Sequence, residues 1–137
     1  MAFQKPIYGA LLDTDFLIDL SRSKRNPWRQ RAEKLLRDIN SEELVISSVT
    51  VIEFLTGIPE NEQTEAQTML QKLYCYVTPT YEEAALAGRL RRDWLARGYV
   101  LSLADVINAA LAMSRNLLLV TRNVAHYPFD QLIILGW

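Results

Sequence analysis

Residues 9–20 read Gly-Ala-Leu-Leu-Asp-Thr-Asp-Phe-Leu-Ile-Asp-Leu, and this stretch decides the predicted fold. An apolar run ends at Leu12, and two carboxylates follow at once, at Asp13 and Asp15. Burying an unpaired charge is costly, so an acid directly after a buried strand is expected where the carboxyl end of the strand opens into a crevice. The stretch therefore predicts a central strand ending at Leu12, with Asp13 as the first group of a functional site.

A short helix is expected after this strand and should run to about Leu20. Asp15 is placed either as the cap of this helix or as a group that supports the site. Asp19 is placed on the exposed face of the helix. Of the three acids in the stretch, only Asp13 is therefore predicted to act directly.

Predicted strands and helices alternate along the rest of the chain. Helix starts are predicted at Pro27 after Asn26, at the capping box of Thr80 and Glu83, and at Ser102. The alternation predicts one α/β domain over residues 1–137, with a mainly parallel central sheet flanked by helices and residues 1–6 as a loose leader. The further strand-like segments are short and lie at residues 44–46, 74–77, 117–121 and 132–135.

The composition is that of an ordinary globular protein, with 50% hydrophobic and 23% charged residues and a formal net charge of −1. A single cysteine, Cys75, excludes an internal disulfide and is expected to be a small buried side chain. With His126 as its one histidine, a single chain cannot build a zinc site from several His and Cys ligands. No signal peptide or transmembrane span is recognised, so a cytoplasmic protein is expected.

Residues 22–37 hold a local excess of positive charge. They contain seven of the fifteen Lys and Arg residues and a single acid, Glu33, which gives this segment a net charge of +6. The segment is either the solvated face of a helix or a surface that meets phosphates or an acidic partner. Because the whole chain is slightly acidic, any contact with nucleic acid must be local.

Three acids stand where packing alone would not place a charge. Asp13 ends the first strand, Glu53 lies inside an apolar helix expected to be buried, and Asp105 opens another helix. Asn123 follows a later strand in a similar setting. In a parallel sheet the carboxyl ends of the strands and the N-termini of the helices approach one edge, so these four side chains are predicted to share a pocket.

Each of the four also has a purely structural interpretation. Asp13 could be a turn or cap residue, and Glu53 could form an ion pair with an arginine. Asp105 and Ser102 have the spacing of a helix cap, and Asn123 could occupy a turn in the left-handed conformation. The functional interpretation gains weight because the acids occur together in these positions.

Clustered carboxylates repel one another, so the predicted pocket calls for a cation. Hard oxygen ligands suit Mg²⁺ or Mn²⁺, which keep open positions for water and phosphate oxygens. Such an ion can activate water and neutralise charge during attack on a phosphodiester. The sequence therefore favours metal-assisted phosphodiester hydrolysis over chemistry based on a Cys–His or Ser–His pair.

Four stretches of the chain together resemble the PIN-domain ribonucleases, and among them the VapC-type toxins of toxin–antitoxin pairs. The resemblance covers nearly the whole chain and is fairly specific because all four motifs occur in order. They are Leu-Leu-Asp-Thr-Asp-Phe-Leu-Ile-Asp-Leu (11–20), Ile-Ser-Ser-Val-Thr-Val-Ile-Glu-Phe-Leu-Thr-Gly (46–57), Leu-Ser-Leu-Ala-Asp-Val-Ile-Asn-Ala-Ala-Leu-Ala (101–112) and Leu-Leu-Val-Thr-Arg-Asn (118–123).

The resemblance implies an endoribonuclease that depends on Mg²⁺ or Mn²⁺. Asp13 and Asp105 would be direct metal ligands, and Glu53 would bind the metal directly or through water. Thr14 and Ser48 would supply hydroxyls that orient ligands or water. The resemblance further implies an RNA substrate, a cognate antitoxin that blocks the site, and a homodimer.

The last motif departs from the pattern of many PIN domains. Asn123 stands where an acid is common, and it brings hydrogen bonds but no charge. Asn123 is assigned to the catalytic set with Asp13, Glu53 and Asp105, while Thr121 and Asp15 are supporting residues. One metal ion or two remains open at this point.

Two other functions compete with this interpretation. A phosphotransferase of the haloacid-dehalogenase type would use Asp13 as a nucleophile, but it needs a downstream lysine, and no lysine follows Lys72. A receiver domain fails in a similar way. The remaining alternative is a PIN-like module that is inactive because of Asn123 and that acts by binding RNA or an antitoxin.

Overall fold

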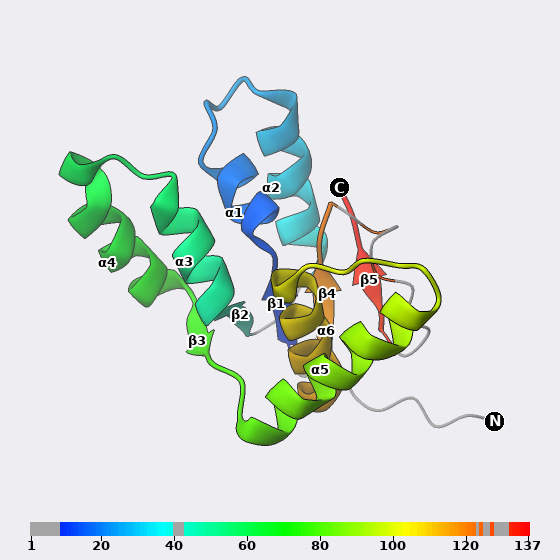
Figure 1. The fold of residues 1–137 in the computed structure, drawn as a ribbon. Coiled ribbons are helices and arrows are strands. Elements are labelled where there is room, and N and C mark those ends of the chain that lie inside the picture. Colours follow the sequence, from blue (N-terminus) through cyan, green and yellow to red (C-terminus); the bar gives the residue numbers. More distant parts are fainter. Residues whose placement is uncertain (1–8, 40–42, 123, 125–126, 128–131) are drawn as a thin grey trace.

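The computed structural model describes residues 9–39, 43–122, 124, 127 and 132–137. Five strands form one parallel sheet in the order β3-β2-β1-β4-β5, which confirms the predicted α/β class. The elements are shown in Figure 1 and are β1 (Gly9–Leu12), α1 (Thr14–Leu20), α2 (Pro27–Ile39), β2 (Leu44–Ser47), α3 (Ser48–Thr56), the 3₁₀ turn η1 (Glu60–Glu62), α4 (Gln63–Leu73), β3 (Cys75–Val77), α5 (Tyr81–Ala96), α6 (Leu103–Arg115), β4 (Leu117–Val120) and β5 (Ile134–Leu135).

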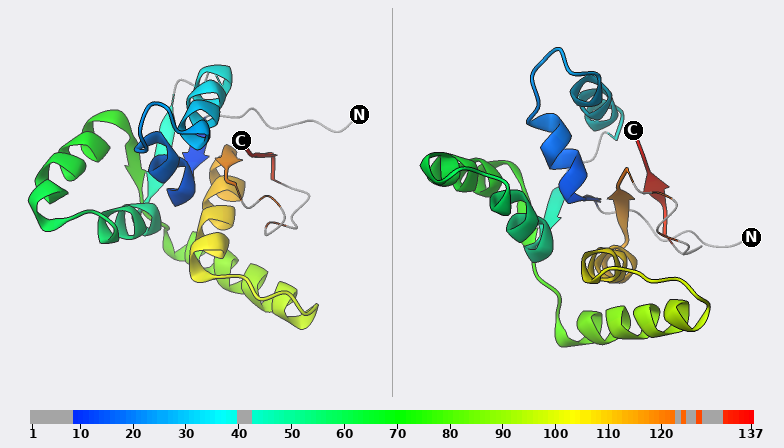
Figure 2. Two further views of the ribbon diagram at one scale, coloured as in Figure 1. Left: turned by 90° about the horizontal axis from the view of Figure 1, so that it is seen from above. Right: turned by 45° about the horizontal axis from the view of Figure 1, so that its top comes forward.

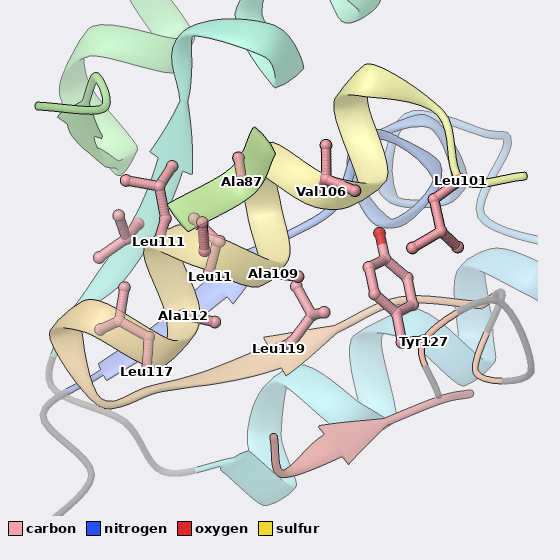
Figure 3. Close-up of a cluster of buried hydrophobic side chains, with 12 residues drawn as sticks. Leu11, Ala87, Leu101, Val106, Ala109, Leu111, Ala112, Leu117, Leu119 and Tyr127 are labelled. Carbon is pink, nitrogen blue, oxygen red and sulfur yellow. The ribbon is translucent and has the colours of Figure 1, made fainter. Parts of the chain in front are cut away.

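The helices cover the two faces of the sheet as two separate layers (Figure 2). Successive residues of a strand point to opposite faces, and the core divides accordingly. Leu11 and Leu119 pack with α5 and α6 on one face, as Figure 3 shows, while Leu12 and Val120 pack with α1 to α4 on the other. The central strands β1 and β4 are fully buried between these layers, which is why they are continuously apolar.

Strand β1 is the centre of the sheet, with β2 on one side and β4 on the other. Its start passes so close to the chain before β2 that a Cβ atom at Gly9 would lie 2.8 Å from the carbonyl oxygen of Glu43. Its end is held by the N–H of Asp13, which donates to the carbonyl oxygen of Val120 at 2.9 Å. The first predicted site residue therefore lies where two central strands end together.

The predicted helix ends are largely confirmed. The hydroxyl of Ser102 caps α6 by accepting from the N–H of Asp105 at 3.1 Å, and α6 ends at Asn116 in the left-handed conformation with φ 53°. Thr80 and Glu83 form the expected capping box at the start of α5. Helix α1 differs, because its N-cap is Asp13 and not Asp15.

A buried ion pair joins this capping box to the end of α6. Both carboxylate oxygens of Glu83 accept from the guanidinium of Arg115 at 2.9 Å, and this pairing lowers the pKa of Glu83 to about 2. The folded state therefore favours the ionised carboxylate.

Replacing Glu83 by glutamine is expected to lower the free energy of unfolding at pH 7 by about 1–3 kcal/mol, because the charged hydrogen bonds are lost. The pKa of Glu83 is depressed from 4.5, so its contribution is present above pH 4.5 and is lost as the pH falls through about 2. Urea unfolding at pH 7 and at pH 2.5 measures the difference. The exposed neighbour Glu82, replaced in the same way, is the control and should change little; equal losses in both variants would contradict the assignment.

Two side chains expected to be buried, those of Glu53 and Cys75, are exposed. Glu53 is exposed, because α3 buries only Thr50 and Phe54 and leaves Ile52 65% exposed. Cys75 is exposed, because β3 is an edge strand of the sheet. None of the helices in the described ranges is long and apolar enough to cross a membrane.

Asp19 departs furthest from its prediction, since it is completely buried. Its carboxylate accepts from the Nε of Arg22 at 2.7 Å, from a guanidinium nitrogen of Arg122 at 3.2 Å, and from the indole N–H of Trp137 at 2.9 Å. The three donors come from the loop after α1, the segment after β4 and the segment after β5. Asp19 is thus a structural centre that ties distant parts of the chain to α1.

Candidate active site

Asp13 lies at the carboxyl end of β1, and its carboxylate is held by three groups. Oδ1 accepts from the backbone N–H of Thr14 at 2.8 Å and lies 3.5 Å from the amide nitrogen of Asn108. Oδ2 accepts from the hydroxyl of Thr121 at 2.8 Å. Strand β4 and helices α1 and α6 therefore fix the orientation of one carboxylate, whose residue is only 7% exposed.

The electrostatic setting of Asp13 is unfavourable for its charge. Burial is the main cause that raises its pKa from 3.8 to about 6, and the nearby carboxylates of Asp15 and Asp105 raise it further. The hydrogen bonds from Thr121 and Thr14 act in the opposite direction. At neutral pH the carboxylate is still mostly ionised. A cation beside it would stabilise this buried negative charge.

Glu53 approaches the same region from α3. Its Oε1 accepts from the hydroxyl of Thr14 at 2.7 Å. Thr14 therefore serves two acids at once, since its backbone N–H binds Asp13 and its hydroxyl binds Glu53. Although Glu53 is exposed, this bond directs its carboxylate toward the end of β1.

Asp105 stands in the first turn of α6 and is held by a buried tyrosine. The hydroxyl of Tyr127 donates to its Oδ1 at 3.1 Å, and Figure 3 shows the phenol reaching toward α6. Burial and the charges of Asp13, Asp105 and Glu53 all raise the pKa of Tyr127. The negative charges of all three predicted acids therefore act on the phenol of Tyr127.

Sequence reasoning missed a buried polar network beneath Asp13. The hydroxyl of Ser47 caps α3 and donates to the Oδ1 of Asn108 at 2.9 Å, which turns the amide nitrogen of Asn108 toward Asp13. Asn108 is fully buried in an otherwise apolar part of α6. Its spacing of three residues from Asp105 puts the two on one helix face, and this pattern is visible in the sequence.

The remaining predicted residues lie around this centre. Ser48 is the first residue of α3 and is half-buried, directly after the networked Ser47. Asp15 lies in the first turn of α1, and its charge acts on Asp13. Asn123 and His126 lie outside the described residues.

The donor set suits a small, hard divalent cation. Within the described ranges, no three His, Cys, Asp or Glu side chains are grouped closely enough to hold a metal ion together. Mg²⁺ is usually bound through one or two carboxylates and keeps several waters, so a three-carboxylate cage is not required. Asp13 and Asp105 would be such a pair of carboxylates, and the charge of Asp105 contributes to the raised pKa of Asp13.

The sequence and the fold of the chain both resemble those of known proteins. The sequence matches the PIN domain over residues 10–131. It is 28% identical over 117 residues to Ribonuclease VapC1 of Methanocaldococcus jannaschii, covering 85% of this chain and 77% of the relative. The fold is similar to a toxin–antitoxin complex from Klebsiella pneumoniae, with 26% identity, a TM-score of 0.72, and 90% of this chain and 95% of that chain covered.

A further structural likeness extends over almost the entire chain. DNA-bound VapBC from Salmonella typhimurium gives a TM-score of 0.74 at 22% identity and covers 96% of this chain and 99% of that chain. The family match spans Asp13, Glu53 and Asp105 and nearly every element of the sheet. The chain therefore belongs to the PIN domain family.

Proposed function

We propose that this protein is an endoribonuclease that hydrolyses RNA phosphodiester bonds with Mg²⁺ or Mn²⁺. The observation that carries the proposal is that Thr14 holds two acids at the carboxyl end of β1, since its backbone N–H donates to Asp13 at 2.8 Å and its hydroxyl donates to Glu53 at 2.7 Å. Tyr127 orients Asp105 in the first turn of α6 by a hydrogen bond of 3.1 Å. PIN domains are metal-dependent nucleases in general, and the similar protein of Methanocaldococcus jannaschii is named a ribonuclease.

Asp13 and Asp105 would hold the metal ion, with Glu53 as a ligand directly or through water. When bound, the ion supplies positive charge to a phosphate oxygen and lowers the pKa of a coordinated water. The chain's own groups set the orientation of the ligands. Thr121 and Asn108 hold the carboxylate of Asp13.

The other two acids are oriented in the same manner. Tyr127 donates to Asp105, and the hydroxyl of Thr14 donates to Glu53. These two bonds each engage one carboxylate oxygen, Oδ1 of Asp105 and Oε1 of Glu53, and among the described residues no hydrogen bond to the second oxygen is seen. Asn123 would complete the polar set from the segment after β4, without adding charge.

In its biological role we propose that the protein acts in the cytoplasm as the toxin of a toxin–antitoxin pair. The similar structure from Klebsiella pneumoniae is a toxin–antitoxin complex, which supports a cognate antitoxin as partner. Large apolar side chains are exposed on α3, α4 and β3, including Ile52 (65%), Leu73 (59%) and Tyr76 (58%). Such exposed apolar area is typical of surfaces that another protein chain covers, and it suits an antitoxin or a homodimer.

Cleavage of RNA by the purified, antitoxin-free protein tests the proposed activity. Cleavage is expected with Mg²⁺ or Mn²⁺, to stop in EDTA, and to be lost in Asp105→Asn, because that variant removes a ligand charge with little change in shape. Asp93→Asn, an exposed residue of α5, is the matched control and should cleave normally. Undiminished cleavage in EDTA would contradict the metal mechanism, and no cleavage of any RNA would favour an inactive binding module.

A further inference from the structure

The positive charge of the molecule is concentrated in the segment that leads into α2. Residues 22–37 carry a net charge of +6, and since the whole chain carries −1, the other residues together carry −7. A polyanion approaching this protein is therefore attracted to one segment and repelled by most of the remainder.

About half of these basic side chains already have acidic partners. Lys24, Arg25 and Arg31 are exposed, and across the described ranges no carboxylate forms a salt bridge with any of them. Their charges are thus available to a ligand. The observed pairs within the segment are Arg22–Asp19 at 2.7 Å, Arg29–Glu33 at 2.7 Å and Lys34–Asp38 at 3.4 Å.

The loop that carries Lys24 and Arg25 is held in place by side chains of α2. The guanidinium of Arg29 donates to the carbonyl oxygen of Arg22 at 2.7 Å, and the amide of Gln30 donates to that of Lys24 at 3.4 Å. Lys24 and Arg25 therefore extend from a backbone that these two hydrogen bonds hold in place. This reduces the conformational entropy that the loop would lose on binding a ligand.

The start of α2 touches the chain next to the active site. Arg122 directly follows Thr121, the residue whose hydroxyl binds Asp13. The guanidinium carbon of Arg122 lies 4.2 Å from the ring centroid of Trp28, and that of Arg31 lies 4.8 Å from it. Arg122 thus connects the positive segment to the chain beside Asp13 in two ways, by its contact with Trp28 and by Asp19, which also binds Arg22.

From this juxtaposition we propose that Lys24, Arg25 and Arg31 bind the phosphate backbone of the RNA beside the scissile bond; the proposal rests on the ribonuclease function above. The acids of the centre repel RNA, so a substrate needs cations close to them but outside the metal site. Trp28 adds an aromatic side chain among the cations, a combination typical of surfaces that bind single-stranded RNA. Hereafter these three residues are called the basic triad.

The salt dependence of RNA binding tests the proposal without relying on cleavage. The probe is a fluorescent, single-stranded RNA of mixed sequence. Its binding in the presence of Mg²⁺ is measured by fluorescence anisotropy at salt concentrations between 50 and 200 mM. Every protein carries Asp105→Asn, so that the RNA is not cut during the measurement. Each phosphate contact contributes about 0.7 to the slope of log K against log salt. Replacing all three residues of the basic triad by alanine is therefore expected to reduce the slope by about 2.

The control removes the same number of charges from the opposite face of the sheet. Arg89, Arg91 and Arg92 are exposed on α5, which packs on the face away from α2 (Figure 2). Their triple alanine variant should leave the slope unchanged. Equal reductions in both triple variants, an unchanged slope in the basic-triad variant, or no RNA binding by the parent protein would each overturn the proposal.

Cleavage assays separate this proposal from the function on which it rests. With Asp105 intact, the basic-triad variant should show a raised KM and an unchanged kcat, because the triad does not contact the reacting atoms. If the basic-triad variant cleaves RNA with an unaltered KM, the proposed ribonuclease activity is supported and RNA binding by the basic triad is contradicted. If the slope changes as predicted but the protein with Asp105 intact cleaves no RNA, RNA binding by the basic triad is supported and the proposed ribonuclease activity is contradicted. Loss of binding to a labelled poly-glutamate peptide, with RNA binding unchanged, would reassign the surface to an acidic protein segment.

Discussion

Asp13→Asn is expected to abolish RNA cleavage and, in the same protein, to raise the free energy of unfolding without metal at pH 7.5 by about 1–3 kcal/mol. The wild-type carboxylate is buried near Asp15 and Asp105, and the pKa of about 6 measures how strongly the fold disfavours its charge. Asparagine keeps the shape and the acceptor for Thr14 but carries no charge. Activity and stability therefore oppose each other at this residue.

The pH dependence gives this prediction its direction. The folded pKa of Asp13, about 6, lies above its ordinary value of 3.8, so the folded protein binds more protons between these values. The wild type therefore loses stability relative to Asp13→Asn as the pH rises from about 4 through 6. Urea unfolding in EDTA at pH 4 and pH 7.5 should show a small difference between the proteins at pH 4 and the full difference at pH 7.5.

Metal should reverse the order of the two proteins. Mg²⁺ or Mn²⁺ binds the folded wild type at pH 7.5 and stabilises it by mass action, whereas Asp13→Asn has lost a ligand and should respond little. Asp93→Asn, exposed on α5, provides the control for the loss of one surface charge. An Asp13→Asn protein that is less stable than the wild type at pH 7.5 in EDTA would show that this carboxylate serves the fold.

Asp19→Ala is expected to destabilise the protein by about 2–4 kcal/mol. Removing one partner of a buried ion pair costs about 3–5 kcal/mol, and the lower range applies because the side chains of Arg22 and Arg122 are 40% and 31% exposed and can regain water. The indole N–H of Trp137 also loses its acceptor. Urea unfolding at pH 7 measures the loss.

The exposed pair of Lys34 and Asp38 provides the matched comparison. Their side chains are 74% and 59% exposed, so Asp38→Ala should change the free energy of unfolding by about 0.5 kcal/mol or less. Similar losses in Asp19→Ala and Asp38→Ala would contradict the role of Asp19 as a buried structural centre.

The sequence was sufficient to predict the layered α/β fold, and it led to the prediction, which stays a prediction, that Asp13, Glu53 and Asp105 form the site. These predictions depend on short-range patterns, namely apolar runs, capping residues and acids at element ends. Capping is local chemistry, which explains why Ser102 and Thr80 were identified correctly. The prediction that these acids lie at one edge rested on the parallel arrangement, because parallel strands bring their carboxyl ends to one edge. In the structure, Thr14 bonds both Asp13 and Glu53.

Burial was predicted less well, because it depends on which neighbours cover a residue. Asp19 has the spacing of a surface helix position, but two arginines and Trp137 from distant segments enclose it. Glu53 lies among apolar residues but on a helix that covers the sheet with one side only. No local pattern distinguishes these cases, since the covering groups lie as many as 118 residues away.

The position of β1 between β2 and β4 has a consequence for the order of events during protein synthesis. The bond between Thr121 and Asp13 joins residues that are 108 positions apart. A growing chain exposes β1 first, and the bond from Thr121 cannot form until the segment after β4 has left the ribosome. Joining residues so far apart also costs loop-closure entropy, which slows the formation of such non-local contacts. The site that would cut RNA is therefore assembled only after most of the chain described here has been made.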